Sequence, residues 1–246
     1  MEDEPTSVKM PSKSWMDRLQ AGIEILLLSG LVSGFLAALA LPLLHIRSTD
    51  RLLQDVRLLS IYLLVESAIS LLLLAGLLKL HQEPAASIGF RGEHWKRDLL
   101  IGLALVPFLF MINGLVAVFF KLYLPRYFMA ENPLIQIVHT PQQLALFVFS
   151  ALIAGGFKEE MQRAFILNRF RGYLGGAGTG LLIWSLAFGA GHYVQGVQGV
   201  VIAALYGFIF GVIYLLSGSI IAPIAAHAAY DTLAILAYWF FSKTLK

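Results

Sequence analysis

Hydrophobic positions along this chain gather in long continuous blocks instead of the narrow stripes of a water-soluble helix. Crossing the hydrocarbon core of a bilayer takes about 20 helical residues, and several blocks meet that length. Backbone groups in lipid find partners only within a helix, so each block is expected to be helical. The pattern therefore predicts an all-α fold, a polytopic membrane bundle of about seven transmembrane helices. The blocks lie at about 21–46, 58–80, 99–124, 142–158, 176–192, 197–216 and 219–241.

Composition narrows the class of protein further. The chain is 58% hydrophobic and only 13% charged, which is typical of an integral, multi-pass membrane protein in contact with lipid. We expect a polar N-terminal tail at 1–20 and a single membrane domain at 21–246. The net charge of +3 is modest, so nucleic acid is not an expected partner. The absence of cysteine from the sequence excludes disulfides, thiolate metal sites and a cysteine nucleophile.

Ionisable side chains at membrane depth are candidates for function, because each is costly unless it faces a wet cavity or a partner. Three clusters qualify. The first is at the end of the fourth block, the second at the end of the fifth, and the third in the middle of the last. Their members are Glu159, Glu160 and Arg163; His192; and His227 with Asp231.

Helix geometry predicts which of these side chains share a face. Glu159 and Glu160 precede Arg163 by four and three residues, so either carboxylate can pair with the guanidinium and leave the other for chemistry. His227 and Asp231 are four apart and point the same way. A carboxylate, two imidazoles and a further polar group could thus meet in one cavity. That set suits hydrolysis by a water molecule that a carboxylate deprotonates, with hydrogen bonds to the developing oxyanion.

The stretch GGFKEEMQRAF, the pair Phe188 and His192, and the pair His227 and Asp231 occur in an order that resembles one known family. It is the CAAX protease and bacteriocin-processing family of intramembrane proteases, and the resemblance covers roughly residues 87–235. The resemblance implies a glutamate-type, membrane-embedded endopeptidase. Its substrate would be a peptide or membrane protein, possibly lipidated, cut near the membrane surface. A bacterial member would work in the plasma membrane of a prokaryote.

The resemblance also implies a role for each candidate residue. Glu159 and His192 would position and activate the water. His227 and Asp231 would form the oxyanion site, for which Asp231 has to be protonated or has to orient His227. Glu160 would pair with Arg163.

The spacing within the first motif leaves two registers open. The family pattern has three residues between the second glutamate and the arginine, whereas only Met161 and Gln162 separate Glu160 from Arg163. Anchoring on Arg163 instead makes Glu159 its partner and puts Lys158 in the place of the catalytic glutamate. That register predicts an inactive member that acts as a membrane scaffold, bacteriocin-immunity factor or carrier. The first register, in which Glu160 pairs with Arg163 across the shortened spacing, leaves open whether Glu159 or Glu160 is the base.

A glutamate with two histidines also resembles a zinc set, so a metalloendopeptidase-like site is an alternative. The H-E-x-x-H spacing of helical zinc proteases is absent from the sequence, and we therefore expect a metal-independent enzyme without a cofactor. Two further acids, Glu24 and Glu66, lie inside apolar blocks. Glu66 is the more central and is the better second candidate to line the cavity.

Overall fold

The computed structural model of the chain describes residues 14–44 and 49–244, and every regular element within them is a helix. The predicted tail, 1–20, lies largely outside the described residues. Its last part already belongs to α1 (Trp15–Leu28), where the side chains of Ser14 and Asp17 form a capping box. The all-α prediction is confirmed for the described part of the chain.

The first predicted block, 21–46, forms two helices instead of one, and its last residues lie outside the described part of the chain. α1 is followed by α2 (Leu31–Leu39), and the two are bent by 44°. The break is at Gly30, whose φ of 88° is a left-handed conformation that glycine adopts without strain. Two short 3₁₀ helices, η1 (Leu41–Leu44) and η2 (Thr49–Leu53), then lead into the long α3 (Val56–Leu80).

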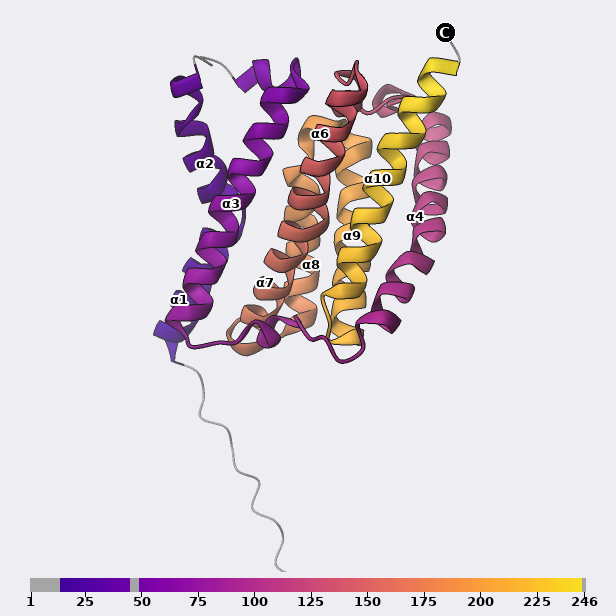
Figure 1. The fold of residues 1–246 in the computed structure, drawn as a ribbon. Coiled ribbons are helices and arrows are strands. Elements are labelled where there is room, and N and C mark those ends of the chain that lie inside the picture. Colours follow the sequence, from indigo (N-terminus) through magenta and orange to yellow (C-terminus); the bar gives the residue numbers. More distant parts are fainter. Residues whose placement is uncertain (1–13, 45–48, 245–246) are drawn as a thin grey trace, which may run out of the picture.

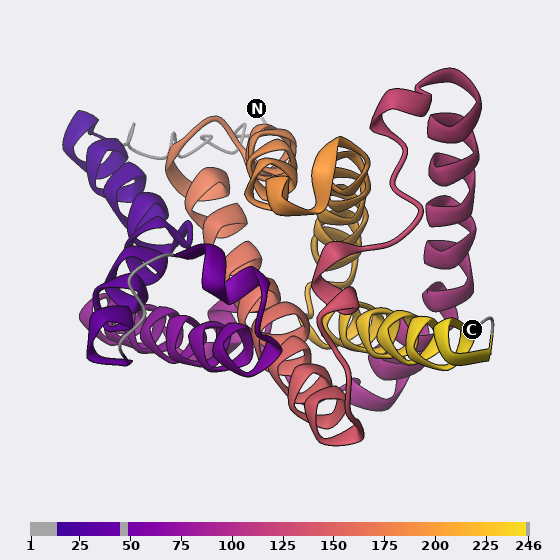
Figure 2. The same ribbon diagram turned by 90° about the horizontal axis from the view of Figure 1, so that it is seen from above.

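Short elements connect the next long helix to its neighbours. η3 (Ala85–Ile88) precedes α4 (Trp95–Tyr123), and η4 (Pro125–Tyr127) and α5 (Pro133–Gln136) follow it. In Figure 2, α4 stands at the edge of the bundle, away from α1, α2 and α3.

A continuous helical rod runs through the middle of the molecule. It consists of α6 (Pro141–Ala151), the π-helical η5 (Leu152–Glu159) and α7 (Glu160–Tyr173). The fourth block was predicted to end near residue 158, but the helix continues for about four more turns, to Tyr173. The polar side chains that suggested an end are instead buried against other helices. The rod begins with a capping box at Thr140 and ends before two glycines with positive φ, Gly175 and Gly176.

The remaining helices surround this rod. α8 (Ala177–Gly191) is followed by η6 (Tyr193–Gln195), α9 (Gly196–Ser217) and α10 (Ile221–Thr244). α10 packs against both α4 and η5, and Figure 1 shows α6, α7 and α8 between α3 on one side and α9 and α10 on the other. Phe165, Ile166 and Leu167 of α7 are fully buried, which places the rod in the core.

Four described helices are long and apolar enough to cross a membrane, or five if the bent pair α1 and α2 is one span. The four are α3, α4, α10 and the stretch from η6 through α9, while α8 is a shorter apolar helix. The chain is therefore an integral membrane protein with four to five candidate spans.

Candidate active site

The site is built around the π-helical segment of the rod. A π-helix is rare and often marks a functional position, because it widens one turn and re-aims the side chains that follow. Two glycines in this segment let α10 come close. A Cβ at Gly155 would lie 2.7 Å from Asp231 Oδ2, and a Cβ at Gly156 would lie 2.7 Å from Ala228 Cβ. The last helix therefore reaches the rod directly beside the two glutamates.

Glu160 is the fully buried member of the glutamate pair. Its Oε2 forms an ion pair with Arg163, and its Oε1 lies 2.7 Å from His227 Nδ1. Because a carboxylate accepts, the proton of this bond is on Nδ1, and the other ring nitrogen, Nε2, points elsewhere. The structure thus pairs Glu160 with Arg163, which is the arrangement of the first register.

Arg163 is itself buried in an aromatic box. Its guanidinium lies 4.8 Å from the ring centroid of Phe188 and 5.5 Å from that of Phe210. Among the described residues, its nitrogens have no hydrogen-bond partner besides the ion pair with Glu160. A buried cation without its partner is strongly unfavourable, so Arg163 holds Glu160 in place.

Glu159 is in a different environment from its neighbour. Its side chain is 20% exposed, whereas that of Glu160 is 1% exposed. Glu159 Oε2 lies 4.0 Å from His227 Nε2, and the same nitrogen lies 3.5 Å from Asp231 Oδ2. His227 therefore stands between the buried Glu160 on one side and the half-buried Glu159 and Asp231 on the other.

His192 caps the end of α8 and approaches the same group of residues. Its Nδ1 lies 2.8 Å from the carbonyl oxygen of Phe188, which only accepts, so Nδ1 carries the proton. In the neutral ring Nε2 is then free to accept a hydrogen bond. The Phe188 ring contacts both His192 and His227, at centroid distances of 4.6 and 6.4 Å. Asp231 also interacts electrostatically with His192 and Glu159.

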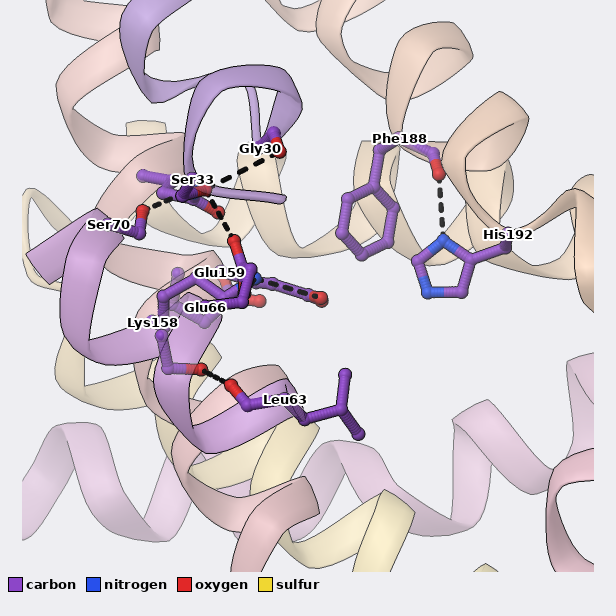
Figure 3. A network of polar contacts seen from close by, with 12 residues as sticks. Gly30, Ser33, Leu63, Glu66, Ser70, Lys158, Glu159, Phe188 and His192 are labelled. Carbon is purple, nitrogen blue, oxygen red and sulfur yellow. Dashed lines mark hydrogen bonds and ion pairs between the residues drawn. The ribbon is translucent and has the colours of Figure 1, made fainter. Parts of the chain in front are cut away.

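Lys158 joins this site to the N-terminal helices (Figure 3). Its Nζ lies 2.9 Å from Glu66 Oε2 on α3 and 3.8 Å from Glu159 Oε1. The other oxygen of Glu66 accepts a hydrogen bond of 2.6 Å from Ser33 Oγ on α2. The predicted second candidate, Glu66, thus lies beside the motif.

Glu24, the other buried acid named from the sequence, lies in a separate network. Its Oε2 is 2.5 Å from Arg169 Nε, and its Oε1 is 2.7 Å from His81 Nε2. Arg169 also pairs with Glu83 at 2.8 Å. This second network joins α1, the end of α3 and α7.

Sequence reasoning missed several residues that shape the site. Phe188 is named in the sequence only as part of the motif it forms with His192, Phe210 is not distinguished there from the other phenylalanines, and Gly155, Gly156 and Ser33 are given no role. Two adjacent glycines directly before the charged motif were the one available signal. The contacts of the other three residues join segments far apart in the chain.

Within the described residues, no three histidine, aspartate or glutamate side chains converge in a way that could hold a metal ion. His227 has its Nδ1 committed to Glu160, and His192 has its Nδ1 committed to a backbone carbonyl.

Comparison with known protein families gives a match in the second half of the chain. Residues 140–233 match the model of the Rce1-like family, described as type II CAAX prenyl endopeptidase Rce1-like. The matched segment contains all six predicted site residues. No curated protein and no solved structure matches the chain. The match supports a CAAX-type intramembrane endopeptidase, and it confirms the resemblance to the CAAX protease and bacteriocin-processing family over residues 140–233.

Proposed function

We propose that the chain is a glutamate-type intramembrane endopeptidase in which Glu159 activates the attacking water. One observation carries this proposal. Of two adjacent glutamates, Glu160 is paired with Arg163 and His227, while the Glu159 side chain is 20% exposed and its Oε2 lies 4.0 Å from His227 Nε2. A general base needs a carboxylate that a water molecule can reach. The carboxylate of Glu159 is the more exposed of the two.

The proposed reaction assigns each proton. His192 Nε2 accepts a hydrogen bond from the water, and Glu159 takes the other proton as the oxygen attacks the peptide carbonyl. His227 in its doubly protonated form and Asp231 in its protonated form donate to the oxyanion. Glu159 then gives its proton to the leaving amine. Each oxyanion donor of this kind accounts for roughly 10²–10³ in kcat.

The substrate class follows from the position of the site within a membrane bundle. We propose a peptide or a membrane-protein segment, possibly lipidated, that is cut near the membrane surface in the plasma membrane of a prokaryote. We also propose that the rod and α8 cross the bilayer together with the other candidate spans, which gives seven passes. The apolar α8 and the buried sequence of α7 support this number.

We propose that the reaction needs no metal. Excess EDTA or 1,10-phenanthroline should leave cleavage by the purified protein unchanged. Loss of cleavage that is restored by added zinc would overturn the metal-independent mechanism and favour the metalloendopeptidase-like alternative.

Cleavage of a membrane-anchored peptide library by the purified protein in lipid nanodiscs tests the function. We expect wild type to cut, and both Glu159→Gln and His192→Ala to abolish cutting while they keep the fold. The control is Glu93→Gln, which changes an exposed glutamate in the connector before α4 and should leave cutting unchanged. Turnover at the wild-type rate in either site variant would contradict the assignment.

A second candidate function is a non-catalytic scaffold, immunity factor or carrier. The observation that favours it is Lys158, a buried ammonium 3.8 Å from Glu159 Oε1 and directly before the proposed base. An inert wild type together with a gain of cleavage in Lys158→Glu would support this candidate. Cleavage by wild type would exclude it.

A further inference from the structure

The Lys158 ammonium lies near two carboxylates, Glu66 and Glu159, at unequal distances. Its side chain is 8% exposed, so its ammonium depends on protein partners instead of water. The 2.9 Å contact with Glu66 is a charge-assisted hydrogen bond, whereas the 3.8 Å separation from Glu159 is too long for one. Lys158 therefore bonds to α3 although its own chain neighbour is a glutamate.

The position of Glu66 is fixed from more than one side. Ser33 of α2 donates to its second oxygen at 2.6 Å, and Tyr62, one turn earlier on α3, interacts electrostatically with both Glu66 and Lys158. Both oxygens of Glu66 thus have partners, one from α2 and one from η5. A carboxylate held in this way is a fixed anchor for the lysine.

The competing acceptor, Glu159, faces other charged groups across the site. These are His227 and Asp231 on α10, while Glu160 and Arg163 form their own pair on α7. A lysine released from Glu66 would find Glu159 as its nearest remaining carboxylate. A close ammonium stabilises the ionised form of a carboxylate and so makes it a weaker proton acceptor.

We propose that Glu66 is a positioning residue for the reaction: it holds the Lys158 ammonium on α3 and so leaves the Glu159 carboxylate available as the base. This inference rests on the proposed function of Glu159. It extends the site beyond the matched segment 140–233 to the N-terminal helices α2 and α3.

The decisive experiment is a double-mutant cycle on kcat and KM. We expect Glu66→Gln to lower kcat about tenfold or more at unchanged KM, because Lys158 then pairs with Glu159. Lys158→Met should not lower kcat, and the double variant Glu66→Gln/Lys158→Met should recover the wild-type kcat.

A merely structural ion pair would behave differently, since loss of either partner would reduce activity in parallel with thermal stability. Equal losses of kcat in both single variants, or no recovery in the double variant, would overturn the proposal.

Two further variants keep the test interpretable. Glu83→Gln is the matched control, because it removes a carboxylate that pairs with a buried cation, Arg169, outside this site. It should leave kcat unchanged. Glu66→Asp keeps the negative charge on a side chain that is one methylene shorter, so the carboxylate lies farther from Lys158. This variant replaces Glu66→Gln in the test if Glu66→Gln does not fold. It should lower kcat in the same direction and by less, and an unchanged kcat would contradict the proposal.

A readout that needs no turnover separates this inference from the proposed function. The infrared carboxylate band of Glu159 is assigned by its loss in Glu159→Gln. We expect this band to shift in Glu66→Gln and to return to its wild-type position in the double variant. An inert wild type with this shift would refute the protease, and with it a role in catalysis, but it would show that Glu66 keeps the Lys158 ammonium away from Glu159. An active wild type whose band does not move would refute the positioning role alone.

Discussion

Two neighbouring glutamates have different proposed roles because their surroundings differ. Glu160 lies between Arg163 and His227 at 1% exposure of its side chain. Glu159, one residue earlier on the rod, has a side chain that is 20% exposed. The same amino acid is thus a structural anchor in one position and the proposed base in the next.

Arg163 is predicted to matter for stability more than any exposed cation on its helix. Arg163→Met removes the guanidinium partner of the buried Glu160, which then keeps only its bond with His227, and should lower the free energy of unfolding by about 3–5 kcal/mol. Chemical denaturation in detergent measures the change. Arg171→Met on the same helix is the control, because Arg171 is exposed, and it should change stability by less than about 0.5 kcal/mol. Similar values for the two variants would show that the buried pair is not needed for the fold.

At the scale of elements, the π-helical η5 and its two glycines bring α10 against the rod. Gly156→Ala would place a Cβ 2.7 Å from Ala228 Cβ and should destabilise the protein by about 1–3 kcal/mol. Gly172→Ala is the matched control in α7, since an added Cβ there meets nothing within 4 Å. It should be neutral or stabilising by up to about 1 kcal/mol. Thermal unfolding compares the two, and equal melting temperatures would contradict the close approach.

Hydropathy predicted some elements well and others poorly, for physical reasons. His192 was expected at the end of a helix and His227 in the middle of the last one, and both are there. These positions follow from continuous apolar sequence. The sequence placed Glu159 and Arg163 on one helix face, but the continuation of the rod through 164–173 was not predicted, because the polar residues of the rod resemble an exit from the membrane. Their partners, such as Ser70 and the Leu28 carbonyl for Gln162, come from helices remote in sequence.

Across the described part of the molecule, two buried networks of ion pairs join the N-terminal helices to the rod. One contains Lys158 and Glu66 at the site, and the other contains Arg169, Glu24 and Glu83. The family match does not extend to α1, α2 and α3, yet these helices supply partners to both networks. The sequence named Glu24 and Glu66 as unusual, but their partners required the fold.

Arg169 is predicted to hold the molecule together without taking part in the chemistry. Arg169→Met leaves two carboxylates without their cation and should lower the melting temperature by about 10 °C. Below that temperature kcat should equal that of wild type, because Arg169 belongs to the network of Glu24 and not to that of Glu159. A large loss of kcat in a folded Arg169→Met protein would show that the two networks are coupled.

The most direct test of the central claim compares Glu159→Gln and Glu160→Gln for both kcat and stability. We expect one variant to lose activity and the other to lose stability. Glu159→Gln should lose about 10³-fold or more in kcat with little change in melting temperature, since its side chain is 20% exposed and its nearest lysine nitrogen is 3.8 Å away. Glu160→Gln should lose stability because Arg163 is left unpaired. A stable, inactive Glu160→Gln beside an active Glu159→Gln would contradict the account and make Glu160 the base.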